Sequence, residues 1–130
     1  MLKKELEECG EIIAGDTCRL REILHPDRTY KIRYSLARAV VKPGETTLPH
    51  YMRTSEVYHI IEGEGVMRIG EETSAVRPGT TVYIPPRAVQ CIRNSGKIDL
   101  VFVCIVDPAW RKEDEVILEA RDAGRAPHAR

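Results

Sequence analysis

The chain has 130 residues, and its 20 lysine and arginine residues balance 20 aspartate and glutamate residues, so the formal net charge is zero. A chain of this length forms one domain with a sizeable core, and its charge balance excludes the basic surface of a nucleic-acid binder. No apolar run reaches membrane-spanning length, and the N-terminus lacks the apolar core of a secretion signal. We therefore expect a cytoplasmic protein without nucleic-acid or membrane partners.

The predicted elements follow one another in three blocks. Residues 1–15 are expected to form an N-terminal arm, of which residues 1–9 carry charges at helical spacing. Residues 16–107 contain short β-prone stretches, such as "RYSLARAVV" before "KPGE" and "SEVYHII" before "EGEG", which recur at steps of about ten residues. This rhythm predicts an all-β antiparallel sandwich or barrel. Residues 108–124, "PAWRKEDEVILEARDAG", predict a short C-terminal α-helix, and residues 125–130 a disordered tail.

Two spaced sets of residues fall inside the predicted barrel, where several strands would contribute side chains to its mouth. The first set is Gly44, His50, Met52, Glu56 and Gly63, and the second is Gly79, Pro85, Gln90 and Asn94. These sets resemble the two motifs of the cupin superfamily, G-x5-H-x-H-x3-E-x6-G and G-x5-P-x-G-x2-H-x3-N. Every spacing fits without an insertion, so the resemblance implies a cupin double-stranded β-helix, or jelly-roll barrel.

The chain departs from the family motifs at three positions. In the family, three histidines and a glutamate hold a divalent metal, which would make His50 and Glu56 ligands here. Met52 stands in place of the second histidine, Gln90 in place of the third, and Arg87 in place of an inner glycine. An amide oxygen and a thioether are poorer donors than imidazole for most divalent metals, so we expect the metal to be weakly bound or absent.

Two hypotheses stay open for this site. In the first, His50, Glu56 and Gln90, with Met52 as a ligand or as a pocket wall, hold a divalent metal. In the second, the Gln90 amide binds a polar small molecule, and Glu56 and His50 form an acid–base pair without metal.

Strand alternation selects further candidates near this site. Tyr58 shares a strand face with Glu56 and is expected to contact a ligand, whereas His59 should face away. Arg38 interrupts an apolar stretch and is a candidate for binding an anionic substrate.

The resemblance implies a metal-dependent isomerase or dioxygenase in which Glu56 and His50 are catalytic. The alternative is a non-catalytic module that binds or senses a sugar or an organic acid. We also expect a homodimer, to which residues 11–24 contribute a strand that crosses to the partner.

Overall fold

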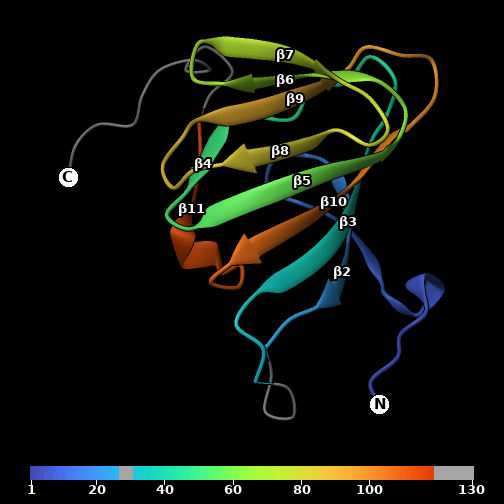
Figure 1. Cartoon of the computed structure of the whole chain (residues 1–130), viewed down its shortest axis with the longest axis vertical. Coiled ribbons are helices and arrows are strands. Elements are labelled where there is room, and N and C mark those ends of the chain that lie inside the picture. The colour runs from blue at the N-terminus through green and yellow to red at the C-terminus, as the bar shows by residue number, and fades with distance from the viewer. Residues whose placement is uncertain (27–30, 119–130) are drawn as a thin grey trace.

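The computed structural model describes residues 1–26 and 31–118, which fold into two facing β-sheets (Figure 1). The six-stranded sheet contains, in spatial order, β1 (Glu11–Ile13), β2 (Arg19–Leu24), β3 (Ser35–Val41), β10 (Leu100–Asp107), β5 (Ser55–Glu62) and β8 (Thr81–Ile84). The five-stranded sheet contains β11 (Glu115–Ile117), β4 (His50–Met52), β9 (Gln90–Asn94), β6 (Gly65–Ile69) and β7 (Glu72–Val76). The predicted all-β barrel is therefore confirmed.

Strand alternation divides each sheet into an inner and an outer face. Every second residue of β3, from Ser35 to Val41, is buried. In the same way β5 buries Glu56, Tyr58 and Ile60 and leaves His59 exposed. The rings of Tyr58 and Phe102 pack with their centroids 4.4 Å apart in the centre of the core. Glu56 therefore lies on the same inward face as the apolar core, which is an unusual place for a carboxyl group.

Two turns show why particular motif positions hold the residues they do. Gly63 has φ +83°, and a Cβ atom at this position would lie 2.4 Å from the carbonyl oxygen of Asp99, so only glycine fits the hairpin. Arg87, at the position where the family motif has glycine, also adopts a positive φ of 67°. Its backbone N–H donates to the Met52 carbonyl at 2.7 Å, which ties this turn to the end of β4.

The C-terminal helix predicted over residues 108–124 does not form in residues 108–118. Lys112–Asp114 make one 3-10 turn, η2, and the chain then continues as β11. β11 pairs with β4, which places Val116 opposite the buried Tyr51. The β-branched pair Val116 and Ile117 gains a strand partner in this way, and that tertiary pairing outweighs the helical spacing of the charged residues. Residues 119–130 lie outside the described residues.

The N-terminal segment also differs from its prediction. A 3-10 turn, η1 (Leu6–Glu8), precedes β1, so the predicted arm already contains part of the sheet. β1 pairs with β2 and β2 pairs with β3 in the same chain, so residues 11–24 extend the six-stranded sheet. The crossing of this segment to a partner stays a prediction. Among the described residues, no helix is long and apolar enough to cross a membrane. The cytoplasmic location stays a prediction.

Candidate functional site

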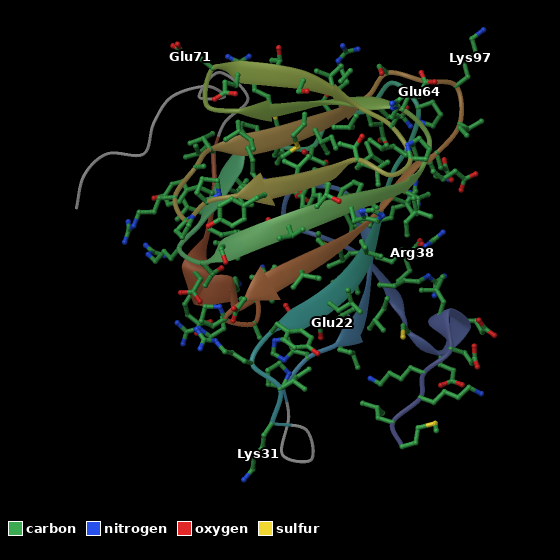
Figure 2. The ribbon with its side chains drawn as sticks, viewed as in Figure 1. Glu22, Lys31, Arg38, Glu64, Glu71 and Lys97 are labelled. Carbon is green, nitrogen blue, oxygen red and sulfur yellow. The ribbon has the colours of Figure 1, made fainter. Side chains whose placement is uncertain are left out.

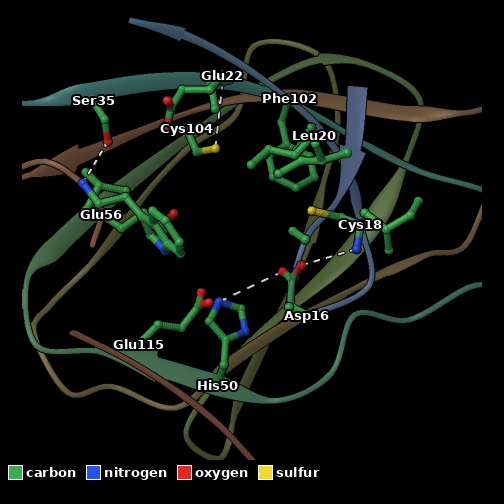
Figure 3. Close-up of a pocket in the computed structure, with 18 of the residues that line it drawn as sticks. Asp16, Cys18, Leu20, Glu22, Ser35, His50, Glu56, Phe102, Cys104 and Glu115 are labelled. Carbon is green, nitrogen blue, oxygen red and sulfur yellow. Dashed lines mark hydrogen bonds and ion pairs between the residues drawn. The ribbon is translucent and has the colours of Figure 1, made fainter. Parts of the chain in front are cut away.

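A cavity of about 560 Å³ lies between the two sheets (Figure 3). Alanine, branched aliphatic and aromatic side chains form its apolar wall. Its polar or ionisable wall residues are Asp16, Cys18, Glu22, Ser35, His50, Glu56, Tyr58, Cys104, Trp110 and Glu115. A cavity of this size, mostly apolar with a few convergent polar groups, is typical of a site for a small organic molecule.

His50 is fixed at the start of β4 and is almost fully buried. Its Nδ1 lies 3.0 Å from the carbonyl oxygen of Leu48, and because a carbonyl only accepts, Nδ1 carries the proton. In the neutral ring the lone pair is therefore on Nε2. The nearest charged atom to Nε2 is Oδ2 of Asp16 at 3.9 Å, which is beyond hydrogen-bond distance. Figure 3 shows the two side chains as neighbours in the cavity wall, with Nε2 directed toward the Asp16 carboxyl group. Nε2 makes no hydrogen bond within the described residues, so its lone pair is available to a ligand.

Glu56 enters the cavity from β5 in the opposite sheet. Burial raises the pKa of Glu56 from 4.5 to about 7, although the nearby His50 and a hydrogen bond from Gln90 act in the opposite direction. The negative charges of Asp16 and Glu115 add to the increase in pKa. At neutral pH this carboxyl group is therefore present in both its protonated and its ionised form, as a general acid or base requires.

Gln90 lies behind Glu56 and is not part of the cavity wall. Its Nε2 donates to Oε1 of Glu56 at 2.9 Å, and β9 places Gln90 directly opposite His50 of β4. Its Oε1 is buried and has no hydrogen-bond partner among the described residues. Gln90 therefore holds Glu56 in position from the core side, in contrast to the direct ligand contact that the sequence predicted.

The other predicted site residues take three different positions. Tyr58 is buried in the cavity wall, and burial beside Glu56 raises the pKa of its hydroxyl group well above 10, so it stays neutral. Met52 is buried in β4 but does not line the cavity. Arg38 faces the outer side of β3, where it lines a separate groove with residues of the N-terminal segment (Figure 2). Arg38 is thus on the wrong face of the strand to bind a substrate in the cavity.

Several cavity residues were not predicted from the sequence, because they lie outside the two motifs. Asp16 belongs to the turn before β2, where its Oδ1 accepts from the backbone N–H of Cys18 at 3.2 Å. The backbone of the same turn is joined to the first motif, because the N–H of Leu48 donates to the Asp16 carbonyl at 2.8 Å. Glu115 and Trp110 come from the segment that was predicted to be helical. An aspartate in a turn before a strand was the only signal in the sequence for any of these residues.

The two cavity cysteines do not provide a nucleophile. Burial raises the pKa of both the Cys18 and Cys104 thiols well above the ordinary value, and the negative charges of Asp16 and Glu56 raise it further. The reactive species of cysteine is the thiolate, so at neutral pH these two thiols act as small apolar groups. Chemistry in the cavity is left to its carboxyl groups and its imidazole.

The predicted metal-ligand set does not fit a metal centre. Within residues 1–26 and 31–118, no three side chains of His, Cys, Asp or Glu converge in a way that could hold a metal ion. Gln90 directs its amide hydrogens, and not a lone pair, toward Glu56, and Met52 is absent from the cavity wall. Ligation needs several donors that share one centre, and these side chains do not supply it. The donor geometry therefore does not support the prediction that these residues bind a divalent metal.

The two facing sheets and the cavity between them define a β-barrel of the double-stranded β-helix type. The family model described as "Cupin domain" matches residues 37–106, more than half of the chain, so this chain belongs to the cupin family. The resemblance of its two motifs to those of cupins is thereby confirmed.

The relatives in sequence include one of similar length and others that are much longer. The chain is 38% identical over 120 residues to an uncharacterised protein of Methanocaldococcus jannaschii, covering 92% of this chain and 96% of that protein. It is 33% identical over 95 residues to the mannose-1-phosphate guanylyltransferase of Salmonella montevideo, covering 72% of this chain and 20% of that enzyme. The chain thus matches about a fifth of the length of the guanylyltransferase.

Solved structures with the same fold include two with enzyme names. Streptomyces Pac13 with uridine superimposes with a TM-score of 0.75 at 20% identity, covering 92% of this chain and 91% of that chain; Pac13 is described as a nucleoside dehydratase. A predicted oxalate decarboxylase from Thermotoga maritima gives a TM-score of 0.73 at 18% identity, covering 82% of this chain and 99% of that chain. At these identities the likeness shows the fold alone, and function has to be argued from the site.

Proposed function

We propose that the barrel cavity binds a small organic molecule and that Glu56 and His50 transfer protons to and from it, as in an isomerase or a lyase. The observation that carries this proposal is the position of the two groups. A buried carboxyl group from one sheet and a buried imidazole from the other enter the same cavity, and Nε2 of His50 makes no hydrogen bond within the described residues.

The surroundings of the two groups suit general acid–base catalysis. Glu56 has a pKa of about 7, so its two protonation states are similarly populated near neutral pH. Nε2 of His50 presents a lone pair because Nδ1 is held by the Leu48 carbonyl. The buried apolar side chains of Phe102 and Ala39 line the cavity beside these groups. A proton removed by one group and returned by the other would interconvert or dehydrate a bound molecule without a change in its oxidation state.

An exchange experiment in D₂O tests this proposal across many candidate substrates at once. The protein is incubated with a defined set of small hydroxyl, carbonyl and amine metabolites, and mass spectrometry detects incorporated deuterium or lost water. We expect at least one metabolite to be labelled or dehydrated by the wild type, and Glu56→Gln to lower that rate by about 100-fold or more, because one acid–base group is lost.

The matched control is Glu62→Gln, which makes the same change at an exposed position of the same strand and should keep the wild-type rate. A Glu56→Gln variant with the full rate would contradict the catalytic role. Binding of a metabolite without any exchange by the wild type would instead make this cupin a binding or sensing module.

We also propose that two copies pair through the outer face of the six-stranded sheet. The strand registers place five apolar residues in one row across that face, since Leu24 is opposite Leu36, Leu36 opposite Ile105, Ile105 opposite Val57, and Val57 opposite Tyr83. Tyr83 is 60% exposed and Ile105 is 40% exposed. A continuous apolar row on a surface is typical of an interaction site, and the twofold symmetry of most homodimers allows one such row to bind its own copy.

Light scattering at micromolar concentration tests the dimer. We expect the wild type to have the mass of two chains, and Ile105→Glu or Tyr83→Glu to give one chain, because each would bury a charge in the interface. Ile98→Glu is the control, since Ile98 is an exposed isoleucine of a turn outside the row. A monomeric wild type would exclude this pairing.

A further inference from the structure

The ionisable groups of the cavity wall are strongly biased toward negative charge. Four carboxyl groups line it, namely Asp16, Glu22, Glu56 and Glu115. No lysine or arginine is among the described residues of the wall, and His50 is the one basic side chain there. None of the four carboxyl groups makes an ion pair with lysine or arginine within the described residues. The cavity therefore repels an anionic ligand.

One of these carboxyl groups is buried with an unused acceptor. Asp16 is only 6% exposed, and its Oδ1 accepts the backbone N–H of Cys18. Its Oδ2 makes no hydrogen bond within the described residues, because its nearest basic neighbour, Nε2 of His50, is 3.9 Å away. Figure 3 shows this carboxyl group directed into the cavity. The Oδ2 atom therefore has acceptor capacity that no hydrogen bond uses, and an N–H group of a ligand in the cavity can donate to it.

Aromatic rings face the same space as the carboxyl groups. Tyr58 and Phe102 form part of the inner wall, and Trp110, which is 37% exposed, lines the cavity between bulk solvent and the core. The side chain of Trp110 is close enough to Glu115 to offset part of the increase in the pKa of that carboxyl group, which burial causes. Aromatic faces attract organic cations through the ring quadrupole, and this attraction adds to that of neighbouring carboxylates.

We infer that the ligand of this cavity is a small organic cation, a molecule with an ammonium or amidinium group attached to an apolar or hydroxylated body. This inference rests on the proposed function, since it takes the same cavity as the binding site. The cationic group interacts with Asp16, Glu115 and the ring of Trp110, and the body of the ligand lies against the apolar wall. The ligand's N–H groups supply the donors that the carboxyl groups lack.

Three probes of nearly equal shape test the charge preference directly: benzylamine, benzyl alcohol and benzoate. Isothermal titration calorimetry at pH 8 and low salt measures the binding of each to the wild type. We expect benzylamine to bind at least about tenfold more tightly than benzyl alcohol, because its charge meets partly buried carboxylates and aromatic rings. Benzoate should show no binding in the same concentration range.

Two variants test whether the preference for the cationic probe arises from carboxyl groups of the cavity. Glu115→Gln and Asp16→Asn should each lower benzylamine affinity about threefold or more and leave benzyl alcohol affinity unchanged, since each removes a charge and keeps the shape. Glu62→Gln, outside the cavity, should leave both affinities as in the wild type. Equal binding of amine and alcohol, tighter binding of benzoate, or no binding of any probe at millimolar concentration would overturn the inference.

The exchange experiment in D₂O distinguishes this inference from the proposed function. Selective binding of benzylamine together with a complete absence of exchange would support a cationic ligand and contradict the proposed proton transfer. Exchange on neutral metabolites that depends on Glu56, without a preference among the three probes, would support the proposed proton transfer. It would contradict the inference that the ligand is a cation.

Discussion

Replacing Glu56 with glutamine should make the protein more stable at pH 8, by about 3 kcal/mol in the free energy of unfolding. The carboxyl group of Glu56 ionises near pH 7 in the folded chain and near its ordinary value of 4.5 when exposed. Ionisation of the buried group at pH 8 therefore costs the folded state about 3 kcal/mol. Glutamine has a similar shape, stays neutral, and can still accept the hydrogen bond from Gln90, so this cost disappears.

The sign of the effect of Glu56→Gln follows from the way in which the stability of the wild type depends on pH. Between pH 4.5 and about 7 the folded chain holds a proton on Glu56 that the unfolded chain has already released, so stability falls as the pH rises through this range. Glu115 acts in the same direction, because burial raises its pKa too. Urea unfolding at several pH values from 5 to 8 should show a declining wild-type curve and a much flatter curve for Glu56→Gln.

The matched control is again Glu62→Gln, for which we expect the wild-type decline. If the curves of Glu56→Gln and the wild type were parallel, Glu56 would not titrate near neutral pH in the folded chain, and its use as an acid–base group would be excluded. A gain in stability on removal of a polar group is expected at sites that are kept for function at the expense of stability.

The sequence predicted the barrel well because the features that define it are local. Strand alternation from Ser35 to Val41 follows the apolar pattern, and turn glycines such as Gly63 occupy positions that no other residue tolerates. The segment around Glu115 was misjudged for the opposite reason. Its charges have helical spacing, and the strand that it forms depends on a partner, β4, more than 60 residues earlier in the chain.

The site was predicted only as far as the two motifs reach. His50 and Glu56 do line one cavity, but Asp16 and Glu115 complete its charge pattern, and neither belongs to a motif. Their proximity depends on the N-terminal segment adding to one sheet and the C-terminal segment to the other. The motif alone also could not show that Gln90 contacts Glu56 from the core side, since spacing fixes a position on a strand but not a side-chain partner.

Asn94 belongs to the second motif, but it stabilises the fold and takes no part in the cavity. It is 1% exposed and does not line the cavity. Its Nδ2 donates to the carbonyl oxygens of Val41 at 2.9 Å and Ile98 at 2.7 Å, and its Oδ1 accepts from the N–H of Gly96 at 2.9 Å. One side chain thus joins the end of β3 to the turn after β9. This arrangement needs a donor on one side of the amide and an acceptor on the other.

Replacing Asn94 with aspartate should therefore destabilise the fold severely, by at least about 4 kcal/mol at pH 7. The new carboxylate would have nearly the same shape, but it would point an acceptor at two carbonyl oxygens, lose two hydrogen bonds and place an unpaired charge in the core. Chemical denaturation measures the loss, with Ser95→Asp as the control, because Ser95 is the exposed neighbour and gains the same charge. The loss should shrink as the pH falls toward about 4, because burial without a partner raises the pKa of the new carboxyl group in the folded chain above its ordinary value of about 3.9, and the protonated group can donate once more. An Asn94→Asp variant as stable as Ser95→Asp at pH 7 would show that these hydrogen bonds do not hold the two segments together.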